Sequence, residues 1–514
     1  MNFTDTHLLS LILFTPAFAA VIMLFLPSGE NKLFRWFTLG ASIIPFIFSL
    51  IAWFRFDVNQ VGYQFVEQYS WYDAIGSSLH LGVDGLSLSM VLLTTLLTPL
   101  AILASFSISD KVKAYMMLFL FLETGMLGVF MAIDLLIFFV FWEIGLVPMY
   151  FLINQWGSAN RNYASLKFMI YTMGGSLGLL LAIQMLGMLF KTYDLKFITD
   201  NWSTYTSAIA GIPASTVKTV AFWAFVIAFA VKVPLWPFHT WLPDAHTEAP
   251  TAGSMILAGV LLKLGAYGFL RLILPLYPAE AKYFAGALAF LAVAAIVFGA
   301  FGSYAQTDFK RLVAYSSVNH MGFVVLGIAA AAFAVGTNDA RIALNGAILQ
   351  MFNHGLSAAG MFFLVGVIYE RTHTRNLEEF GGLFPLVPIY GGILIFTSMA
   401  SLGLPGLNGF ISEFLVVRGS FGVGVNAEAG SFMTIYTVIS MLGLLFTGAY
   451  ILKGIKKVLH GPMNEHWAHG EHKLTEINTR EIIVMVPLMA LILWIGLYPA
   501  WILNVINRAV VMLF

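Results

Sequence analysis

The fold is decided by residues 221–243, AFWAFVIAFAVKVPLWPFHTWLP, where a long apolar run contains one lysine and then three prolines. Lys232 lies two residues before Pro234, so we expect the helix to be interrupted beside the charge. A lysine at the centre of a bilayer helix costs about 2.5–3.5 kcal/mol and is rarely kept without a use. A charge beside interrupted backbone at membrane depth is typical of ion sites in transporters. The segment therefore predicts a membrane protein that moves protons or other small cations.

The composition of the whole chain agrees with this prediction. Of its 514 residues, 59% are hydrophobic and 10% are charged, too few to cover a soluble protein of this length. There is no cysteine, which excludes disulfides and thiolate-held iron–sulfur clusters. The 26 basic and 26 acidic residues balance, which argues against nucleic acid as a partner. No basic residues precede the apolar run at 8–26, so we interpret it as a membrane helix and not a signal peptide.

Apolar runs of membrane-spanning length predict an all-α polytopic membrane protein with about fourteen transmembrane helices. They lie near residues 8–26, 36–54, 83–107, 114–131, 133–153, 168–190, 219–238, 249–270, 283–304, 312–335, 342–369, 386–417, 431–452 and 482–507. Loops on one side hold 15 Lys and Arg residues, and loops and helix ends on the other side hold 9. The positive-inside rule then predicts both termini outside and the loop 453–480 in the cytoplasm.

Two predicted helices, the seventh and the twelfth, contain strong breaks, at 231–243 and at 401–414 (SLGLPGLNGFISEF). Each break has an ionisable neighbour, Lys232 in one and Glu413 in the other. Matched breaks five helices apart indicate an internal repeat, inverted because five is odd. We therefore divide the chain into N-terminal helices 1–3 (1–112), a first repeat of helices 4–8 (113–274), a second of helices 9–13 (282–455), and a loop with helix 14 (456–514).

Ionisable residues in the first half are the first candidates for chemistry. Glu143 lies in the middle of the fifth predicted helix and needs a cation or a proton there. We predict that it pairs with Lys232, and the alternative is an ion pair that only fixes helix packing. Glu123 is a spare partner or a group that admits protons. His239 follows Lys232 by seven residues and shares its helical face if the helix resumes.

The second half offers Lys263, His320, His354 and Glu413. Polar residues around His320 could hold a short file of water between Lys263 and His354. The alternative for His354 is a neutral imidazole bonded to a neighbouring helix. Glu413 is interpreted as the group where this path leaves the membrane, and the alternative is a residue that faces lipid headgroups.

Two weaker motifs predict neither a metal nor a bound cofactor on this chain. GVGVNA (422–427) lacks the strand and helix that a dinucleotide loop requires. The histidines in HGPMNEHWAHGEH (460–472) are better explained by a solvated loop, because no cysteine accompanies them.

The run KVPLWPFHTWLPDAHTEAPTAGSMILAGVLLKLGAYGFLR (232–271) resembles the signature of the antiporter-like subunits of respiratory complex I, NADH:quinone oxidoreductase. The resemblance continues through FWEIGLVPMY, AYSSVNHMGF, NHGLSAAGMFF and LPGLNGFISEF, and covers most of residues 80–460. The glutamate at position 413 makes the chain more similar to subunit M, the equivalent of mitochondrial chain 4, than to its sibling subunits. The siblings typically carry lysine at that position.

The resemblance implies fourteen transmembrane helices, two inverted five-helix repeats and a proton-translocating module. We expect this module in a bacterial inner membrane, and a thylakoid or organelle membrane is the alternative. The resemblance implies that Glu143 and Lys232 are a coupled pair, and that Lys263 is a central relay. The path would continue through His320 and His354 to Glu413. Flavin, iron–sulfur clusters and quinone would belong to partner subunits, with neighbouring antiporter-like subunits beside this chain and no redox chemistry on the chain itself.

Two other functions stay open at this point. One is a subunit of a multisubunit cation/proton antiporter or a membrane-bound hydrogenase, which would use the same central lysines. The other is a scaffold without transport, whose buried charges only pack helices.

Overall fold

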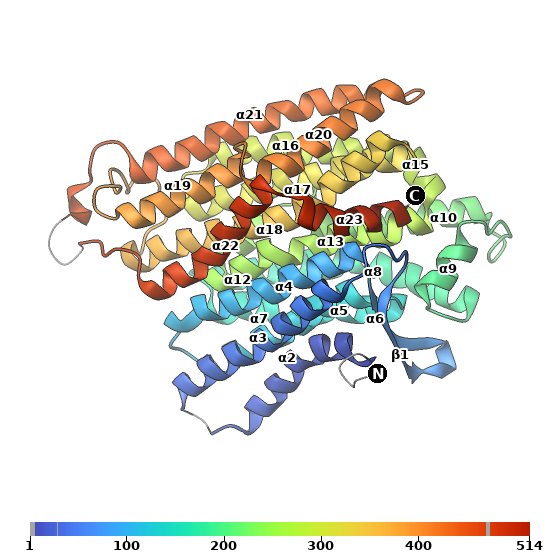
Figure 1. Ribbon diagram of the computed structural model, residues 1–514, viewed down its shortest axis with the longest axis horizontal. Coiled ribbons are helices and arrows are strands. Elements are labelled where there is room, and N and C mark those ends of the chain that lie inside the picture. The colour runs from blue at the N-terminus through green and yellow to red at the C-terminus, as the bar shows by residue number, and fades with distance from the viewer. Residues whose placement is uncertain (1–5, 28, 469–472, 514) are drawn as a thin grey trace.

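Long apolar helices make up most of the molecule, because a chain in lipid must satisfy its backbone donors and acceptors internally. The computed structural model describes residues 6–27, 29–468 and 473–513. Within these residues, thirteen helices are long and apolar enough to cross a membrane. They lie side by side along one common direction (Figure 1). The prediction of an all-α polytopic membrane protein is confirmed.

The helices follow the predicted runs closely. Those up to the first large break are α2 (Leu8–Phe25), α3 (Asn31–Arg55), α4 (Gly85–Ala104), α5 (Val112–Met131), α6 (Leu135–Ile144), α7 (Leu146–Trp156), α8 (Arg161–Phe190), α9 (Leu195–Trp202) and α10 (Ala214–Lys232). The next are α11 (Trp241–Glu248), α12 (Thr251–Ile256), α13 (Leu262–Gly268), α14 (Leu274–Leu276) and α15 (Pro278–Tyr283). The last are α16 (Ala285–Ala305), α17 (Phe309–Phe333), α18 (Asn338–Thr372), α19 (Pro388–Leu402), α20 (Asn408–Asn426), α21 (Ser431–Leu459), α22 (Thr479–Leu497) and α23 (Ala500–Met512).

Both predicted breaks are present in the structure. The seventh crossing ends as α10 at Lys232, and the chain resumes as α11 at Trp241. The twelfth is divided between α19 and α20, so neither half is among the thirteen long spans. Counting the α19–α20 pair as one crossing brings the total to the predicted fourteen. The inverted relation between the two halves stays a prediction.

A two-stranded hairpin, which the sequence analysis did not predict, precedes α4. Its strands β1 (Gln64–Tyr72) and β2 (Ser77–Val83) pair antiparallel. In β1 only two of nine residues are buried, so the apolar alternation that marks a strand is absent. The side chain of Asp84 then caps α4 by accepting a hydrogen bond from the Ser87 amide.

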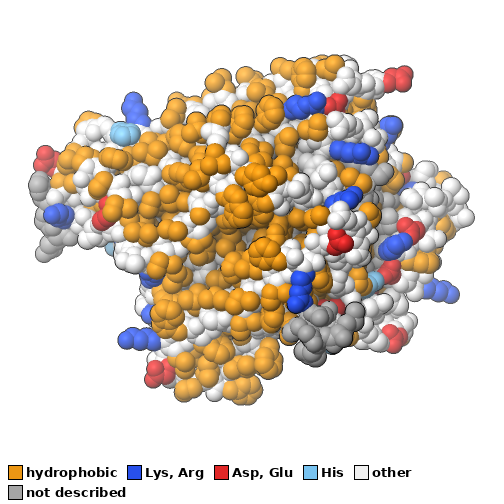
Figure 2. Space-filling view, in the orientation of Figure 1, with side chains coloured by type: hydrophobic (Ala, Val, Ile, Leu, Met, Phe, Trp, Pro, Cys, Tyr) orange, Lys and Arg blue, Asp and Glu red, His pale blue; other side chains and the backbone are white. Residues whose placement is uncertain are grey.

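The surface divides into a broad apolar middle and two more polar ends. Figure 2 shows hydrophobic side chains across the middle, with charged side chains gathered toward the two ends. The start of α2 and the end of α23 lie toward one end of the molecule, and the end of α21 lies at the opposite end (Figure 1). An even number of crossings produces this arrangement, and the apolar middle has the character of a surface that faces lipid.

Candidate functional site

Lys263 lies at the centre of the molecule with its side chain fully buried. It follows a π-helical turn, Leu257–Leu261, and a second such turn follows α13. Its ammonium group donates to the Ala258 carbonyl and lies 2.7 Å from Nδ1 of His354. Close contact between α13 and the end of α10 requires Gly265, since a Cβ there would lie 2.8 Å from the Phe229 carbonyl oxygen.

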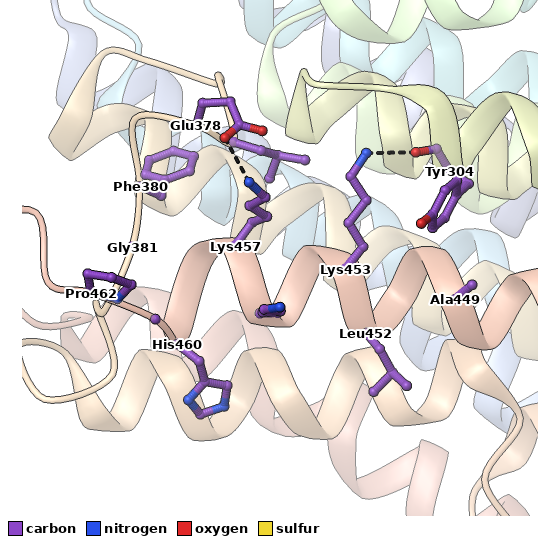
Figure 3. Close-up of a pocket in the computed structure, with 13 residues that line it drawn as sticks. Tyr304, Glu378, Phe380, Gly381, Ala449, Leu452, Lys453, Lys457, His460 and Pro462 are labelled. Atoms are coloured by element: carbon purple, nitrogen blue, oxygen red, sulfur yellow. Dashed lines mark hydrogen bonds and ion pairs between the residues drawn. The ribbon is translucent and has the colours of Figure 1, made fainter.

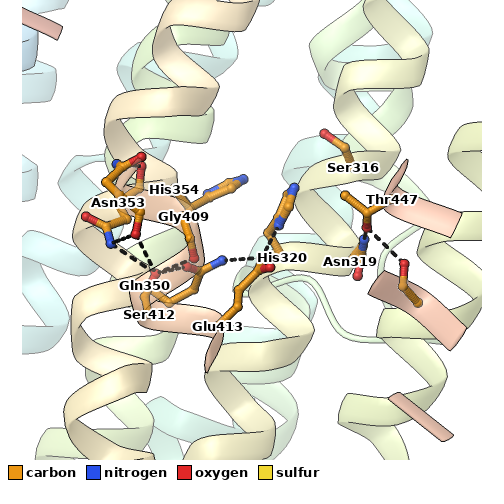
Figure 4. Close-up of polar contacts among 12 residues, drawn as sticks. Ser316, Asn319, His320, Gln350, Asn353, His354, Gly409, Ser412, Glu413 and Thr447 are labelled. Atoms are coloured by element: carbon orange, nitrogen blue, oxygen red, sulfur yellow. Dashed lines mark hydrogen bonds and ion pairs between the residues drawn. The ribbon is translucent and has the colours of Figure 1, made fainter. Parts of the chain in front are cut away.

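Two histidines and a glutamate form a buried series that begins at this lysine. His354 belongs to α18 and His320 to α17, and their ring centroids lie 5.5 Å apart. Nδ1 of His320 lies 2.8 Å from Oε1 of Glu413 in α20 (Figure 4). All of these side chains are buried. The predicted order is therefore wrong in one respect, because His320 lies beyond His354 and not between it and Lys263.

The carboxylate of Glu413 is held by neighbours from α18 and faces the second break. Gln350 donates to Oε1 of Glu413 at 3.0 Å, and Gln350 itself accepts from Ser412 at 2.5 Å. A Cβ at Gly403, the residue that ends α19, would lie 3.3 Å from Oε2 of Glu413. Gly403 has a φ of +81°, which favours glycine. Glu413 is thus a buried group beside interrupted backbone, and not a residue among headgroups.

Reciprocal amide contacts fix the start of α20 against α18. Asn353 donates to the Asn408 carbonyl at 2.7 Å, and Asn408 donates to the Asn353 carbonyl at 3.2 Å. Asn353 also reaches Ser412 at 3.0 Å (Figure 4). These bonds hold the first turn of α20, and with it Glu413, in register with the histidines.

Lys232 occupies the last position of α10 and is buried. The interruption after it is bridged by Trp241, whose indole donates to the Val231 carbonyl at 2.8 Å. The Lys232 ammonium lies 4.9 Å from the centre of the Trp142 ring. An aromatic face attracts a desolvated cation, so Trp142 supplies a neutral partner for this charge.

Glu143 follows Trp142 and is half-buried, with no hydrogen-bond partner for Oε1 among the described residues. No ion pair within 4 Å joins it to Lys232 in the described part of the chain, although its charge acts on that lysine. The predicted contact pair is therefore separated in this conformation. The helix is also interrupted just after Glu143, between α6 and α7 at Gly145.

Glu123 and His239 are the two remaining candidates from the first half of the chain. Glu123 on α5 is fully buried, and neither of its oxygens has a partner within the described residues. His239 lies in the non-helical stretch before α11, with its ring 6.1 Å from that of Tyr315. The helix does not resume before His239, so the condition for a helical face shared with Lys232 is not met.

His246 and Lys310 were missed by the sequence analysis. His246, in α11, is fully buried, stacks on Phe362 at 4.2 Å, and has no partner for either ring nitrogen among the described residues. The charges that act on it are those of Lys310 and Lys263. Lys310 is buried at the start of α17 and donates to the Ala249 carbonyl at 2.5 Å. The sequence feature that could have pointed to His246 is the run DAHTEAP, which follows directly after the first break.

A polar hollow of about 310 Å³ opens near this lysine. It is lined by Asp308 and Arg375, which pair at 3.2 Å, and Arg375 also donates to the Thr247 carbonyl of α11. Within the described residues no group of three or more His, Asp or Glu side chains could hold a metal. Of the loop histidines in 460–472, those at 469 and 472 lie outside the described residues.

The chain is similar to known proteins over nearly its whole length. A protein-family model described as NADH:quinone oxidoreductase/Mrp antiporter, TM, matches residues 132–443. NADH-quinone oxidoreductase subunit M of Rickettsia conorii is 39% identical, with 98% of each chain covered. NAD(P)H-quinone oxidoreductase chain 4 1 of Nostoc sp. is also 39% identical, over 97% of this chain and 89% of its own length.

Solved structures agree at the level of the fold. A chain of respiratory complex I from Thermus thermophilus with bound NADH superimposes with a TM-score of 0.83 and 26% identity, over 98% of this chain and 99% of its own. A chain of the Mrp complex from Dietzia sp. shares the fold with a TM-score of 0.81 and 23% identity, over 99% of this chain and 52% of its own. The chain belongs to the NADH:quinone oxidoreductase/Mrp antiporter family, and within it to the group of NADH-quinone oxidoreductase subunit M.

Proposed function

We propose that this chain is the proton-translocating membrane subunit of an NADH-quinone oxidoreductase. The observation that carries the proposal is a buried series of titratable groups joined by two direct contacts. Lys263 lies 2.7 Å from His354, and His320 lies 2.8 Å from Glu413. A scaffold that only packs helices has no need for four ionisable side chains in sequence, because each is costly in lipid. The names of the subunit M relatives support the same function.

In this proposal a proton leaves the Lys263 ammonium for Nδ1 of His354. A histidine that gains a proton on one ring nitrogen can release one from the other, so His354 passes a proton onward from Nε2. His320 has its Nδ1 on Glu413 and its Nε2 3.4 Å from the Tyr450 hydroxyl. It therefore receives a proton on Nε2 and delivers one from Nδ1 to Glu413. Glu413 releases its proton toward the break beside Gly403.

In this proposal protons enter on the other side of Lys263 from Glu413, through Lys310 and His246. The hollow at Asp308 and Arg375 opens beside the start of α17, where Lys310 lies, and would admit water there. His246 lies within electrostatic reach of both Lys310 and Lys263 and has free ring nitrogens among the described residues. A proton received there has Lys263 as its next acceptor. Positive residues are more numerous at this end, which supports cytoplasmic uptake and periplasmic termini.

In this proposal the energy for proton movement comes from neighbouring membrane subunits. It acts on the chain through Lys232 and Glu143. Because the chain has no cysteine, iron–sulfur clusters are expected in partner subunits, together with flavin and quinone. In the observed conformation Lys232 rests on Trp142, away from Glu143. Movement of Glu143 toward Lys232 would change the charge felt by Lys263 across the α10–α13 contact. Each proton moved against 100 mV requires about 2.3 kcal/mol, which one such ion pair in lipid can supply.

The division of the chain into repeats at 113–274 and 282–455 is part of the same proposal. Lys232 ends α10 just before one break, and Glu413 lies in the second turn of α20, just after the other. One ionisable group beside each break supports two half-channels that meet at Lys263. The segments 1–112 and 456–514 would then flank this transport unit.

Lys263→Met in the reconstituted complex tests the function. Methionine keeps most of the buried volume but carries no proton, so electron transfer should continue with a lower number of protons moved per electron. Lys196→Met is the matched control, because Lys196 is a solvated lysine whose side chain is 75% exposed. NADH oxidation and dye-detected proton uptake are measured in the same proteoliposomes. An unchanged proton-to-electron ratio in an assembled Lys263→Met complex rejects the proposal. Sodium-dependent proton flux without NADH would favour an antiporter.

A further inference from the structure

A cavity of about 690 Å³ opens beside the last turns of α21. Three lysines line it, Lys453, Lys456 and Lys457, together with the acidic side chain of Glu378 (Figure 3). The rest of the lining is largely apolar or aromatic, including Tyr304, Phe380, Ala449, Leu452 and Pro462. The cavity therefore combines cationic groups with apolar walls, the two features that an amphiphilic anion requires.

The positive charge of this cavity is only partly neutralised. Lys457 pairs with Glu378 at 2.7 Å, and its side chain remains 39% exposed. Lys453 donates to the carbonyl groups of Tyr304 and Gln306 at the end of α16, at 2.7 and 2.8 Å, and neither partner carries a negative charge. Lys456 is exposed, and its amine bonds to no described residue. Three lysines against one glutamate leave a net positive charge, and one ammonium group is free to bind an anion.

The position of the lysines along α21 matches the headgroup level of a bilayer. α21 begins at Ser431, so Lys453 lies about 33 Å along its axis and Lys457 about 39 Å along it. The hydrocarbon core of a bilayer is about 30 Å thick, which places these amines just beyond it. The same helix exposes a series of large apolar side chains on the way, Ile435, Val438, Ile439, Leu442, Leu445 and Leu452. Acyl chains can lie along this face while a headgroup reaches the lysines.

We propose that this cavity is a binding site for an anionic phospholipid, with its phosphate held by Lys456 and the neighbouring lysines. The glycerol and first methylenes of the lipid contact Leu452 and Tyr304, and the acyl chains follow the exposed face of α21. Basic pockets at the cytoplasmic ends of transmembrane helices commonly select such lipids. The site lies outside the series of groups from Lys263 to Glu413. It does not depend on the proton transfer proposed for that series.

Photolabelling of the intact complex tests the site. The complex is placed in phosphatidylcholine nanodiscs that contain a small fraction of photoactivatable phosphatidylglycerol, and labelled peptides are mapped by mass spectrometry. We expect labels in the peptide that contains residues 449–462. Each lysine near an anionic headgroup strengthens binding about fivefold, so K456Q/K457Q should reduce labelling roughly twenty-five-fold at subsaturating lipid. K473Q is the matched control, since Lys473 is exposed and follows α21 in the same interhelical segment.

Four results would overturn the site. Equal labelling by photoactivatable phosphatidylcholine would mean that only acyl chains are bound. Competition by inorganic phosphate as effective as competition by phosphatidylglycerol would mean that a free anion occupies the lysines. Absence of lipid labels at 449–462 in the wild-type complex would mean that a partner protein covers the cavity. Unchanged labelling in K456Q/K457Q, with an assembled complex, would also reject the assignment.

Discussion

The Lys263 ammonium lies 2.7 Å from Nδ1 of His354, and both side chains are buried in the middle of the helix bundle. A lysine and a histidine at this distance cannot both carry a full charge without strong repulsion. One proton is therefore shared between them, and its position depends on the charges around the pair. In the proposed path this relationship would make His354 the first proton acceptor from Lys263, and the ring of His320 the next.

If the two histidines act in series, their mutations should not be additive. His354→Ala alone and His320→Ala alone should each lower the proton translocation rate by about 10²-fold, and the double variant should be no slower than either. Proton uptake and NADH oxidation are followed together in proteoliposomes. His460→Ala is the control, because His460 is exposed at the end of α21. Losses that multiply in the double variant would mean two independent roles.

The contact between Lys232 and Trp142 predicts a second, graded effect. Lys232→Ala should abolish proton pumping and leave assembly intact, because it removes the charge on which the neighbouring subunits act. Trp142→Leu keeps the charge of Lys232 but removes an attraction of about 0.5–2 kcal/mol. It should therefore change the rate of proton translocation without abolishing it. Trp36→Leu is the control, since Trp36 is 64% exposed. A Lys232→Ala complex with a normal proton-to-electron ratio would contradict the assignment.

The positions of the breaks and the identities of the central residues could be predicted from sequence. Proline and glycine interrupt helices through local backbone geometry, so both breaks follow from residues 231–243 and 401–414. A charge in an apolar run is costly wherever the helix packs, so Lys232 and Lys263 were found without knowing their neighbours.

The contacts between helices could not be predicted in the same way. Which residues meet depends on the rotation of each helix, and the apolar pattern is weak when most faces are buried. For this reason the order of His320 and His354 was wrong, and the pairing of Glu143 with Lys232 was replaced by the Trp142 contact. His246 was missed because nothing in the run around it reveals that its ring nitrogens lie unpartnered near two lysines.

Outside the membrane spans, Asp194 predicts a pH-dependent contact at the end that carries both termini. Burial alone would raise the pKa of Asp194, but the hydrogen bonds from His80 at 3.0 Å and from the Phe197 amide at 2.8 Å hold that pKa below its usual value. A lowered carboxyl pKa adds stability at neutral pH, and this stability is lost as the pH falls through the folded-state pKa, below about 4.

Asp194→Asn should therefore speed amide exchange in α9 at neutral pH, because asparagine can still cap that helix but carries no negative charge for His80 and the helix N-terminus. The difference from wild type should shrink as the pH approaches the range where the carboxyl is protonated. Asp200→Asn is the control on the same helix, where the pair with Lys196 is exposed. Hydrogen-exchange mass spectrometry of the complex measures both variants against wild type at each pH. A difference that stays constant down to acidic pH would show that His80 and the cap do not act through the charge of Asp194.

The last prediction concerns the buried ion pair between Arg271 and Asp84, whose atoms lie 2.6 Å apart with side chains 5% and 2% exposed. Arg271 also donates to Ser87 and to the Tyr63 hydroxyl, both at 3.2 Å, so it joins α4 to the segment before the hairpin. Removal of one member leaves an uncompensated charge in the interior and costs about 3–5 kcal/mol. Arg271→Met should therefore strongly lower the melting temperature of the subunit in the complex, or its amount in membranes.

The double variant Arg271→Met with Asp84→Asn decides whether charge is the cause. Asparagine still caps α4 through its side-chain oxygen, and it leaves no charge behind. The double variant should therefore be more stable than Arg271→Met alone, which is the opposite of what additive losses produce. Thermal unfolding of the purified complex, followed by tryptophan fluorescence, measures the order of the three proteins. A double variant less stable than Arg271→Met would mean that the pair acts through packing and hydrogen bonds to Tyr63 and Ser87, and not through neutralisation of Asp84.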